Sequence, residues 1–154
     1  MRVYYDTGVL LPLYIEEVFS KAVTKIVEER AEPIPINLFH EVEFENAVRL
    51  KVFRRELTAS KLNEILAARD EDIRGGRLIR RPVNWPLVYE EARRLSEAAT
   101  VKTGCRTLDV LHIAIAVKWG CEWFATADER QLKAARMAGL KLLELLPLPS
   151  GERE

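Results

Sequence analysis

The stretch Glu122–Gly139, EWFATADERQLKAARMAG, decides the fold because a strand pattern changes to a helix pattern within a few residues. Its first five residues, EWFAT, are mostly aromatic or apolar and predict a short buried strand. The segment ERQLKAARMAG then has helical spacing and ends in glycine, the residue that most often follows the end of a helix. Strands that alternate with helices in this way predict a parallel sheet covered by helices.

Asp128 lies between this strand and this helix and has two interpretations. Together with Gln131 it matches a capping box, in which the carboxylate accepts hydrogen bonds from the first turn of the helix. Asp128 also follows the carboxyl end of a strand, which is where ligands bind in open α/β folds. The residues of this stretch alone leave both roles open.

The rest of the chain repeats the alternation. Short apolar segments predict strands at RVYYD, PIPIN and LKLLEL, and RLIRRPV is an extended segment with less certain pairing. TGVLLPLY predicts a turn into a first helical segment. Helical spacing predicts further helices over residues 20–32, 38–55, 59–74, 86–104, 107–120 and 129–139. The helix over 107–120 is apolar on every face, which indicates burial against the sheet.

Composition indicates a soluble globular protein. Of 154 residues, 48% are hydrophobic and 31% are charged, and 24 Lys and Arg balance 24 Asp and Glu, so no overall basic field indicates a polyanionic partner. No repeat or linker divides the chain. We therefore predict one domain over residues 1–147 and a flexible tail over 148–154.

Two further features predict a cytoplasmic protein without a membrane segment. The segment RVYYDTGVLLPLY is interrupted by Asp6 and Pro12 and fits neither a signal peptide nor a membrane span. Cys105 and Cys121 make no disulfide framework or zinc motif, which is typical of thiols in a reducing cytosol.

Glu43 interrupts an apolar helix face. At 100° per residue it shares that face with Phe39 and Ala47. A buried carboxylate without a partner is costly, so this position indicates either a bound partner or an ordinary, partly exposed glutamate.

Asp6 and Asp109 also have both structural and functional interpretations. Asp6 closes the first strand and is placed to cap the following turn. Asp109 lies near the start of a buried helix, where the helix dipole favours an acid. Together with Glu43 and Asp128, these acids are expected to converge at the strand ends. Converging carboxylates repel one another unless a cation neutralises them, and an all-oxygen set selects Mg²⁺ or Mn²⁺, ions that serve phosphoryl chemistry.

The order of these motifs resembles the PIN domain, and in particular the VapC-type toxin ribonucleases. The resemblance runs from Val3 to about Leu145 and rests on Asp6-Thr7 after the first strand, EVEFENAVRL, RTLDVLHIAIA and FATADERQLKAA. It implies a three-layer α/β/α sandwich with a central, mainly parallel sheet, and a Mg²⁺- or Mn²⁺-dependent endoribonuclease. It also implies an RNA substrate, a small antitoxin partner and a homodimer.

The resemblance assigns the site residues by motif. The catalytic, metal-binding acids are Asp6, Glu43, Asp109 and Asp128. Thr7 and Thr126 match hydroxyl residues that support the metal site, and Asn46 follows the glutamate as in the family. Asn37 stands where many relatives have Ser or Thr, and it retains the ability to donate and accept hydrogen bonds.

Other polar and aromatic residues are interpreted conservatively. The candidate RNA-binding residues, which would contact phosphates, are Arg49, Arg54, Arg80 and Arg81. Arginines on a protein surface more commonly form ion pairs with nearby acids. His40 and His112 are expected to be hydrogen-bonded core histidines instead of catalytic bases. Core or interface positions are expected for Trp85, Trp119 and Trp123.

Two other functions remain as alternatives. A catalytically weak or inactive module could use the same fold to bind RNA or to assemble complexes. A phosphotransfer protein would use an aspartyl nucleophile, but haloacid-dehalogenase-type enzymes have a second Asp two residues after the first, where this chain has Gly8. A receiver domain would have no use for Glu43 within its helix.

Overall fold

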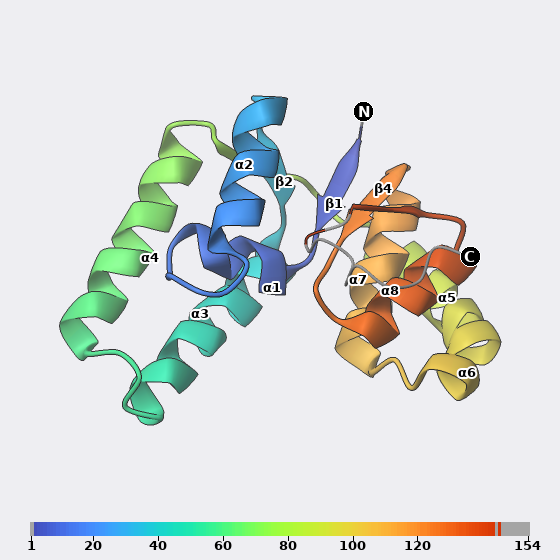
Figure 1. Ribbon diagram of the computed structural model, residues 1–154. Coiled ribbons are helices and arrows are strands. Elements are labelled where there is room, and N and C mark those ends of the chain that lie inside the picture. Colours follow the sequence, from blue (N-terminus) through green and yellow to red (C-terminus); the bar gives the residue numbers. More distant parts are fainter. Residues whose placement is uncertain (1, 144, 146–154) are drawn as a thin grey trace, which may run out of the picture.

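The computed structural model describes residues 2–143 and 145 and shows an α/β/α sandwich with a parallel sheet between helices (Figure 1). The strands are β1 (Val3–Tyr5), β2 (Ile34–Ile36), β3 (Leu78–Arg80), β4 (Trp123–Ala125) and β5 (Lys141–Leu143). The helices are α1 (Thr7–Leu10), η1 (Leu11–Leu13), α2 (Ser20–Arg30), α3 (Leu38–Phe53), α4 (Ala59–Arg74), α5 (Trp85–Leu95), η2 (Ser96–Thr100), α6 (Val101–Thr103), α7 (Thr107–Lys118) and α8 (Glu129–Met137). The predicted strands and helices are therefore present, whereas the predicted tail over 148–154 lies outside the described residues.

Several helices differ in detail from their predictions. Helices α2, α7 and α8 each end two residues before the predicted bound, at Arg30, Lys118 and Met137. The helix expected over residues 86–104 starts at Trp85, after the capping residue Asn84, and widens into the π-helical turn η2 before α6. Helix α3 ends at Phe53, two residues early, and Arg55 then adopts the left-handed conformation with φ of 62°. The spacing of apolar residues does not reveal the change from α-helix to π-helix, because these residues recur at a similar interval in both.

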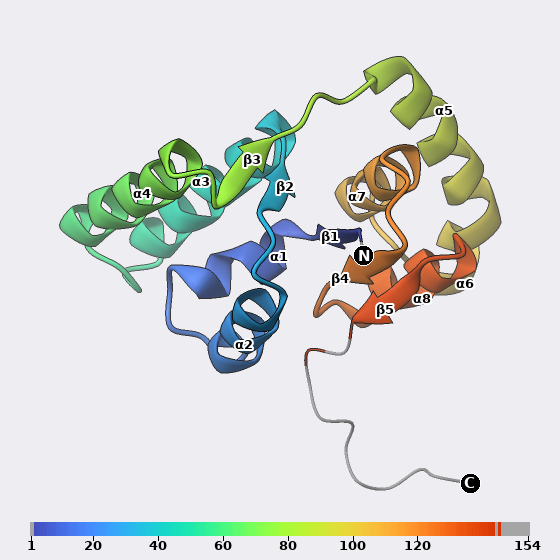
Figure 2. The same cartoon turned by 90° about the horizontal axis from the view of Figure 1, so that it is seen from above.

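The strands form two parallel sheets, β1-β4-β5 and β2-β3 (Figure 2). Tyr5 pairs with Ala125 in the first sheet, and Ile34 pairs with Leu78 in the second. Strands β1 and β2 contact each other, but they do not pair, so the two sheets are separate. The carbonyl of Tyr5 at this break accepts a hydrogen bond from His40 Nε2 at 2.9 Å, so a side chain takes the place of a ladder partner.

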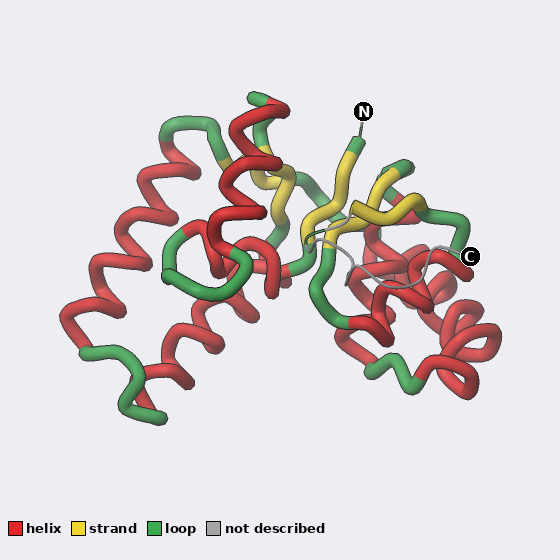
Figure 3. Tube along the Cα trace, in the orientation of Figure 1, coloured by secondary structure: helices red, strands yellow, loops and turns green. Residues whose placement is uncertain are grey.

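The central strands are buried on both faces, with helices on either side (Figure 3). Tyr4 and Phe124 stack with ring centroids 5.4 Å apart on the face covered by α5 and α7. Val3 and Tyr5 pack with α2 on the opposite face. Because α7 packs against both the sheet and α5, it is apolar all round. No helix within the described residues is long and apolar enough to cross a membrane.

His40 and Asn37 fix the start of α3 against the end of β1. The Oδ1 atom of Asn37 accepts hydrogen bonds from the backbone nitrogens of Phe39 (2.8 Å) and His40 (3.1 Å). The backbone nitrogen of Asn37 donates to His40 Nδ1 at 3.3 Å, while His40 Nε2 donates to β1. This arrangement places Glu43, one turn along α3, beside the end of β1.

The pKa of His40 generates a test of this anchor. Burial lowers this pKa to about 3, so the folded protein keeps His40 neutral while the unfolded chain binds a proton below about pH 6.5. Stability is then lost as the pH falls from about 6.5 towards 3. We expect the free energy of unfolding of the native chain, relative to His40→Gln, to fall by roughly 2 kcal/mol between pH 7.5 and 5. Urea denaturation of both proteins at each pH measures this difference, and a constant difference would contradict the assignment.

Candidate functional site

Asp6 occupies the end of β1 and turns its carboxylate towards α7 and β4. Its backbone nitrogen donates to the carbonyl of Ala125 at 3.0 Å, which fixes it beside the end of β4. The carboxylate makes no cap bond to α1, so the interpretation of Asp6 as a capping residue is wrong. Instead Oδ2 accepts from Thr126 Oγ1 at 3.2 Å, and Oδ1 lies 3.3 Å from His112 Nε2.

Glu43 reaches the same histidine from α3. Its Oε2 atom accepts a hydrogen bond from Thr7 Oγ1 at 2.8 Å and also contacts His112 Nε2. The side chain of Glu43 is 21% exposed and that of Asp6 is 16% exposed. Two carboxylates from distant parts of the chain therefore meet at one buried imidazole.

His112 is held on its other side by Tyr4. The Tyr4 hydroxyl lies 2.7 Å from His112 Nδ1, and both side chains are buried. Since carboxylates only accept hydrogen bonds, the proton of a neutral His112 lies on Nε2, and Nδ1 then accepts from Tyr4. Burial favours a lower pKa for His112, but the hydrogen bond to Glu43 and the charges of Asp6, Glu43 and Asp109 outweigh it and raise the pKa.

The pKa of Asp6 is raised, mainly by burial and further by the neighbouring acids. Burial raises this pKa most, and the negative charges of Glu43 and Asp109 raise it further, against the opposing effects of His112 and Thr126. Asp109 is therefore close enough to act on Asp6 electrostatically. The combination of burial and like charge is typical of functional sites.

Asp109 and Asp128 are held by exposed arginines at the other end of the site. Asp109 Oδ2 accepts from the backbone nitrogen and from Nε of Arg106, both at 3.2 Å. Asp128 Oδ1 accepts from the backbone nitrogens of Arg130 (2.8 Å) and Gln131 (3.1 Å), so Asp128 caps α8. Arg106 Nη2 also lies 4.0 Å from Asp128 Oδ2, so one guanidinium group spans both acids.

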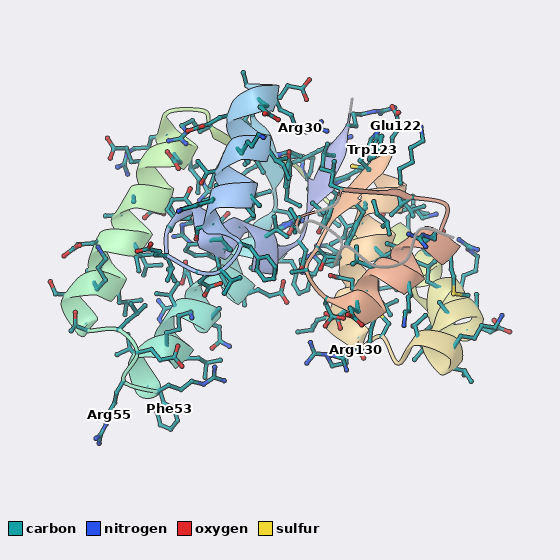
Figure 4. The ribbon with its side chains drawn as sticks, viewed as in Figure 1. Arg30, Phe53, Arg55, Glu122, Trp123 and Arg130 are labelled. Atoms are coloured by element: carbon teal, nitrogen blue, oxygen red, sulfur yellow. The ribbon has the colours of Figure 1, made fainter. Side chains whose placement is uncertain are left out.

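Arg130 adds a second guanidinium group beside Asp128. Its Nη2 donates to Asp128 Oδ2 at 3.2 Å, and Figure 4 shows the Arg130 side chain at the solvent edge near the start of α8. Burial favours a higher pKa for Asp128, but the hydrogen bonds from Arg130 and from two backbone nitrogens hold it below the ordinary value. Asp128 is therefore ionised over the physiological range of pH.

Thr126 connects the two ends of the site. Its buried hydroxyl donates to Asp6 Oδ2 and accepts from the backbone nitrogen of Asp128, both at 3.2 Å. The strand end of β4 thus sets the spacing between these two acids.

The donor atoms of the site fit a hard divalent cation. Carboxylate oxygens predominate, and the mutual repulsion of Asp6, Glu43 and Asp109 is the kind that a cation relieves. Across residues 2–143 and 145, however, no three Asp, Glu, His or Cys side chains already form a metal-binding group. His112 and the two arginines hold the carboxylates in this arrangement.

The remaining predicted residues have other surroundings. Asn37 caps α3 and Asn46 is exposed on the same helix. Arg80 makes a bidentate ion pair with Glu41 at 2.7 and 2.9 Å, and Arg54 is exposed beyond the end of α3.

Sequence patterns did not identify three residues of the site as partners of the acids. His112 was expected to be a hydrogen-bonded core histidine, which it is, but its bonds to Asp6 and Glu43 were not anticipated. Arg106 and Arg130 were not singled out. The available signals were local: His112 lies three residues after Asp109 on one helix face, and each arginine lies within three residues of an acid that it binds.

Comparisons with known proteins identify the family of the chain and support its fold. The sequence matches the PIN domain family over residues 3–137. The structure is similar to the crystal structure of FitAcB from Neisseria gonorrhoeae, with 16% sequence identity, a TM-score of 0.59, and coverage of 93% of this chain and 97% of that chain. No curated protein matches the sequence significantly. At this identity, the structural likeness shows the shared fold.

The hydrogen bond between Tyr4 and His112 generates a test of the site's scaffold. Tyr4→Phe removes only the phenol oxygen and leaves buried His112 Nδ1 without its partner, so we expect a loss of about 1–3 kcal/mol in the free energy of unfolding. Tyr5→Phe is the matched control because Tyr5 packs on the opposite face of β1. Urea denaturation compares the two, and equal losses would show that the bond has no special importance.

Proposed function

This chain belongs to the PIN domain family, whose members are generally nucleases, and we propose that it is a metal-dependent endoribonuclease that hydrolyses RNA phosphodiesters. The observation that carries the proposal is the meeting of Asp6 and Glu43 at His112, next to the strand end that holds Asp128. Acids that converge from β1, α3 and β4 at the end of a parallel sheet occupy the position where α/β folds bind their ligands.

In this proposal the four acids hold Mg²⁺ or Mn²⁺. Thr126 joins Asp6 and Asp128 by hydrogen bonds, and these two acids hold the principal ion. Glu43 and Asp109 complete the shell of oxygen ligands around it. Such a cation, when bound, lowers the pKa of water and stabilises developing negative charge on phosphate oxygens. Glu43 and Asp109 orient the attacking water, and hydrolysis leaves a 5′-phosphate and a 3′-hydroxyl.

In this proposal Arg106 and Arg130 contribute to RNA binding. The side chains of Arg106 and Arg130 are 68% and 47% exposed, so each can exchange a carboxylate contact for a phosphate contact at small cost. Their guanidinium groups are positioned to hold the phosphates that flank the scissile bond. Arg49, Arg54, Arg80 and Arg81 remain candidates for more distant contacts.

Removal of one acid tests the proposed reaction. We expect Asp6→Asn to lower Mn²⁺-dependent cleavage of single-stranded and structured RNA by about 100-fold or more, since even outer partners of a metal site contribute about 10- to 100-fold. Calorimetric titration with Mn²⁺ should show a parallel loss of affinity. Glu129→Gln is the control, because Glu129 is exposed on the first turn of α8 beside Asp128.

The outcome distinguishes the enzyme from the alternative function. Cleavage that requires the metal and is lost in Asp6→Asn supports the nuclease. Absence of cleavage of any RNA tested, with RNA binding retained, would favour an inactive RNA-binding or assembly module. Equal losses in Asp6→Asn and Glu129→Gln would contradict the assignment of the site.

We further propose that the nuclease is the toxin of a toxin–antitoxin pair, which forms a homodimer and is inhibited by a small partner protein. Support comes from the resemblance to VapC-type toxins and from an apolar face on the protein surface. This face consists of Leu38 and Val42 on α3 and Trp85 and Tyr89 on α5. Leu38 and Val42 are 70% and 67% exposed, and packing of Phe39 against Trp85 joins the two helices. Exposed apolar side chains gathered in this way mark protein-binding surfaces.

The apolar face tests self-association. If it forms the contact between two copies, Leu38→Glu should place a charge twice in a two-fold interface and convert the dimer to a monomer. Sedimentation velocity measures the change, and Val101→Glu is the control because Val101 is 94% exposed, lies on α6 and is not one of the residues of this face. A Leu38→Glu protein that remains dimeric would place the interface elsewhere.

A further inference from the structure

A basic groove of about 280 Å³ lies at the break between the two sheets. It shares no residue with the acidic site. Its charged lining residues are Arg2, Glu32, Arg80 and Arg81. Arginine therefore supplies most of the charge in a groove that takes no part in the proposed hydrolysis step.

The three arginines differ in how far their charge is neutralised. Arg80 is paired with both carboxylate oxygens of Glu41. Arg2 and Arg81, in contrast, have no carboxylate within 4 Å anywhere in the described part of the chain. Two of the three positive charges therefore remain available to a ligand.

Uncharged contacts hold Arg81 in place. Its Nη2 donates to the carbonyl of Trp119 at 3.3 Å, and its guanidinium carbon lies 5.1 Å from the centre of the Trp119 ring. Trp119 is itself fixed by a hydrogen bond from Nε1 to the carbonyl of Pro82 at 3.0 Å. Arg81 is therefore held in one orientation without a carboxylate that would neutralise its positive charge, as in a preorganised anion site.

Arg2 lies just before β1 and approaches the turn at Trp119 and Gly120, which Arg81 also contacts. A Cβ atom on Gly120 would lie 3.3 Å from Arg2 Nη1, and Gly120 has a φ of 66°. Glycine therefore satisfies the backbone and leaves room for the guanidinium group. Burial raises the pKa of the Cys121 thiol to about 11, against the opposing charges of Arg81 and Arg2, so both guanidinium groups lie near this one side chain.

The walls between these charges are apolar and rigid. They are formed in part by Pro33, Pro35, Ile79 and Pro82. Two guanidinium groups provide the planar donors that bind phosphate oxygens best, and flat apolar walls suit a sugar or a base. This combination matches a nucleotide unit better than it matches a small inorganic anion.

We propose that this basic groove binds a phosphate group of the RNA chain at a distance from the acidic site, with Arg2 and Arg81 as the phosphate ligands. The inference rests on the proposed RNA substrate but not on catalysis. It makes the groove a second attachment point, which adds affinity without taking part in bond cleavage.

The test measures RNA binding by the full chain in EDTA, with fluorescence anisotropy of a labelled single-stranded RNA over a range of salt concentrations. Each phosphate contact to single-stranded nucleic acid contributes about 0.7 to the slope of log K against log salt. We therefore expect the double variant Arg2→Gln/Arg81→Gln, which loses this one phosphate contact, to bind more weakly, with a slope smaller by about 0.7. Arg81→Lys should keep most of the slope because it keeps the charge.

The matched control is Lys133→Gln/Arg136→Gln, which removes two positive charges from the exposed surface of α8. An unchanged slope in the Arg2/Arg81 variant, or an equal decrease in the control, would overturn the inference. Competition by inorganic phosphate or a mononucleotide as strong as competition by RNA would also overturn it, because the groove would then bind a free anion. Loss of cleavage without loss of this binding would contradict only the proposed function.

Discussion

The structure depends on the contacts of one buried imidazole, His112 on α7, with Tyr4 and Asp6 of the first strand segment and Glu43 of α3. A buried imidazole must satisfy both ring nitrogens, and a buried carboxylate must have a partner. Strand β1, helix α3 and helix α7 therefore have to pack in the one arrangement that brings these groups together. The same contacts that fix the packing also gather the acids, so stability and the site have a common origin.

The sequence predicts most of the elements because each carries its own signal. Thr58 caps α4 through a bond from the backbone nitrogen of Lys61, and the apolar face of α5 begins after the cap Asn84. The break between β1 and β2 was not predictable, because it depends on His40 reaching the Tyr5 carbonyl from another element. Local patterns specify elements, whereas the ends of ladders depend on contacts between segments far apart in the chain.

The site also has a part that the sequence predicts and a part that it does not. Position alone indicated Asp6 and Asp128, since both follow strands, and an interrupted apolar face indicated Glu43. Their partners were not predictable from spacing, because His112 meets acids 106 and 69 residues away in sequence. Asp128 shows why a capping signature does not exclude a functional role: it caps α8 with Oδ1, while Oδ2 faces Arg106 and Arg130.

The acids have different partners at the two ends of the site: a buried histidine at one end and exposed arginines at the other. A continuous series of contacts joins them in the order Glu43, His112, Asp6, Thr126, Asp128, Arg106 and Asp109. At the buried end His112 is 1% exposed, so separating it from its carboxylates would be costly. At the other end the side chains of Arg106 and Arg130 are exposed, and an ion pair made by an exposed arginine contributes little. The arginines are therefore easier to move away from Asp109 and Asp128 than His112 is from Asp6 and Glu43.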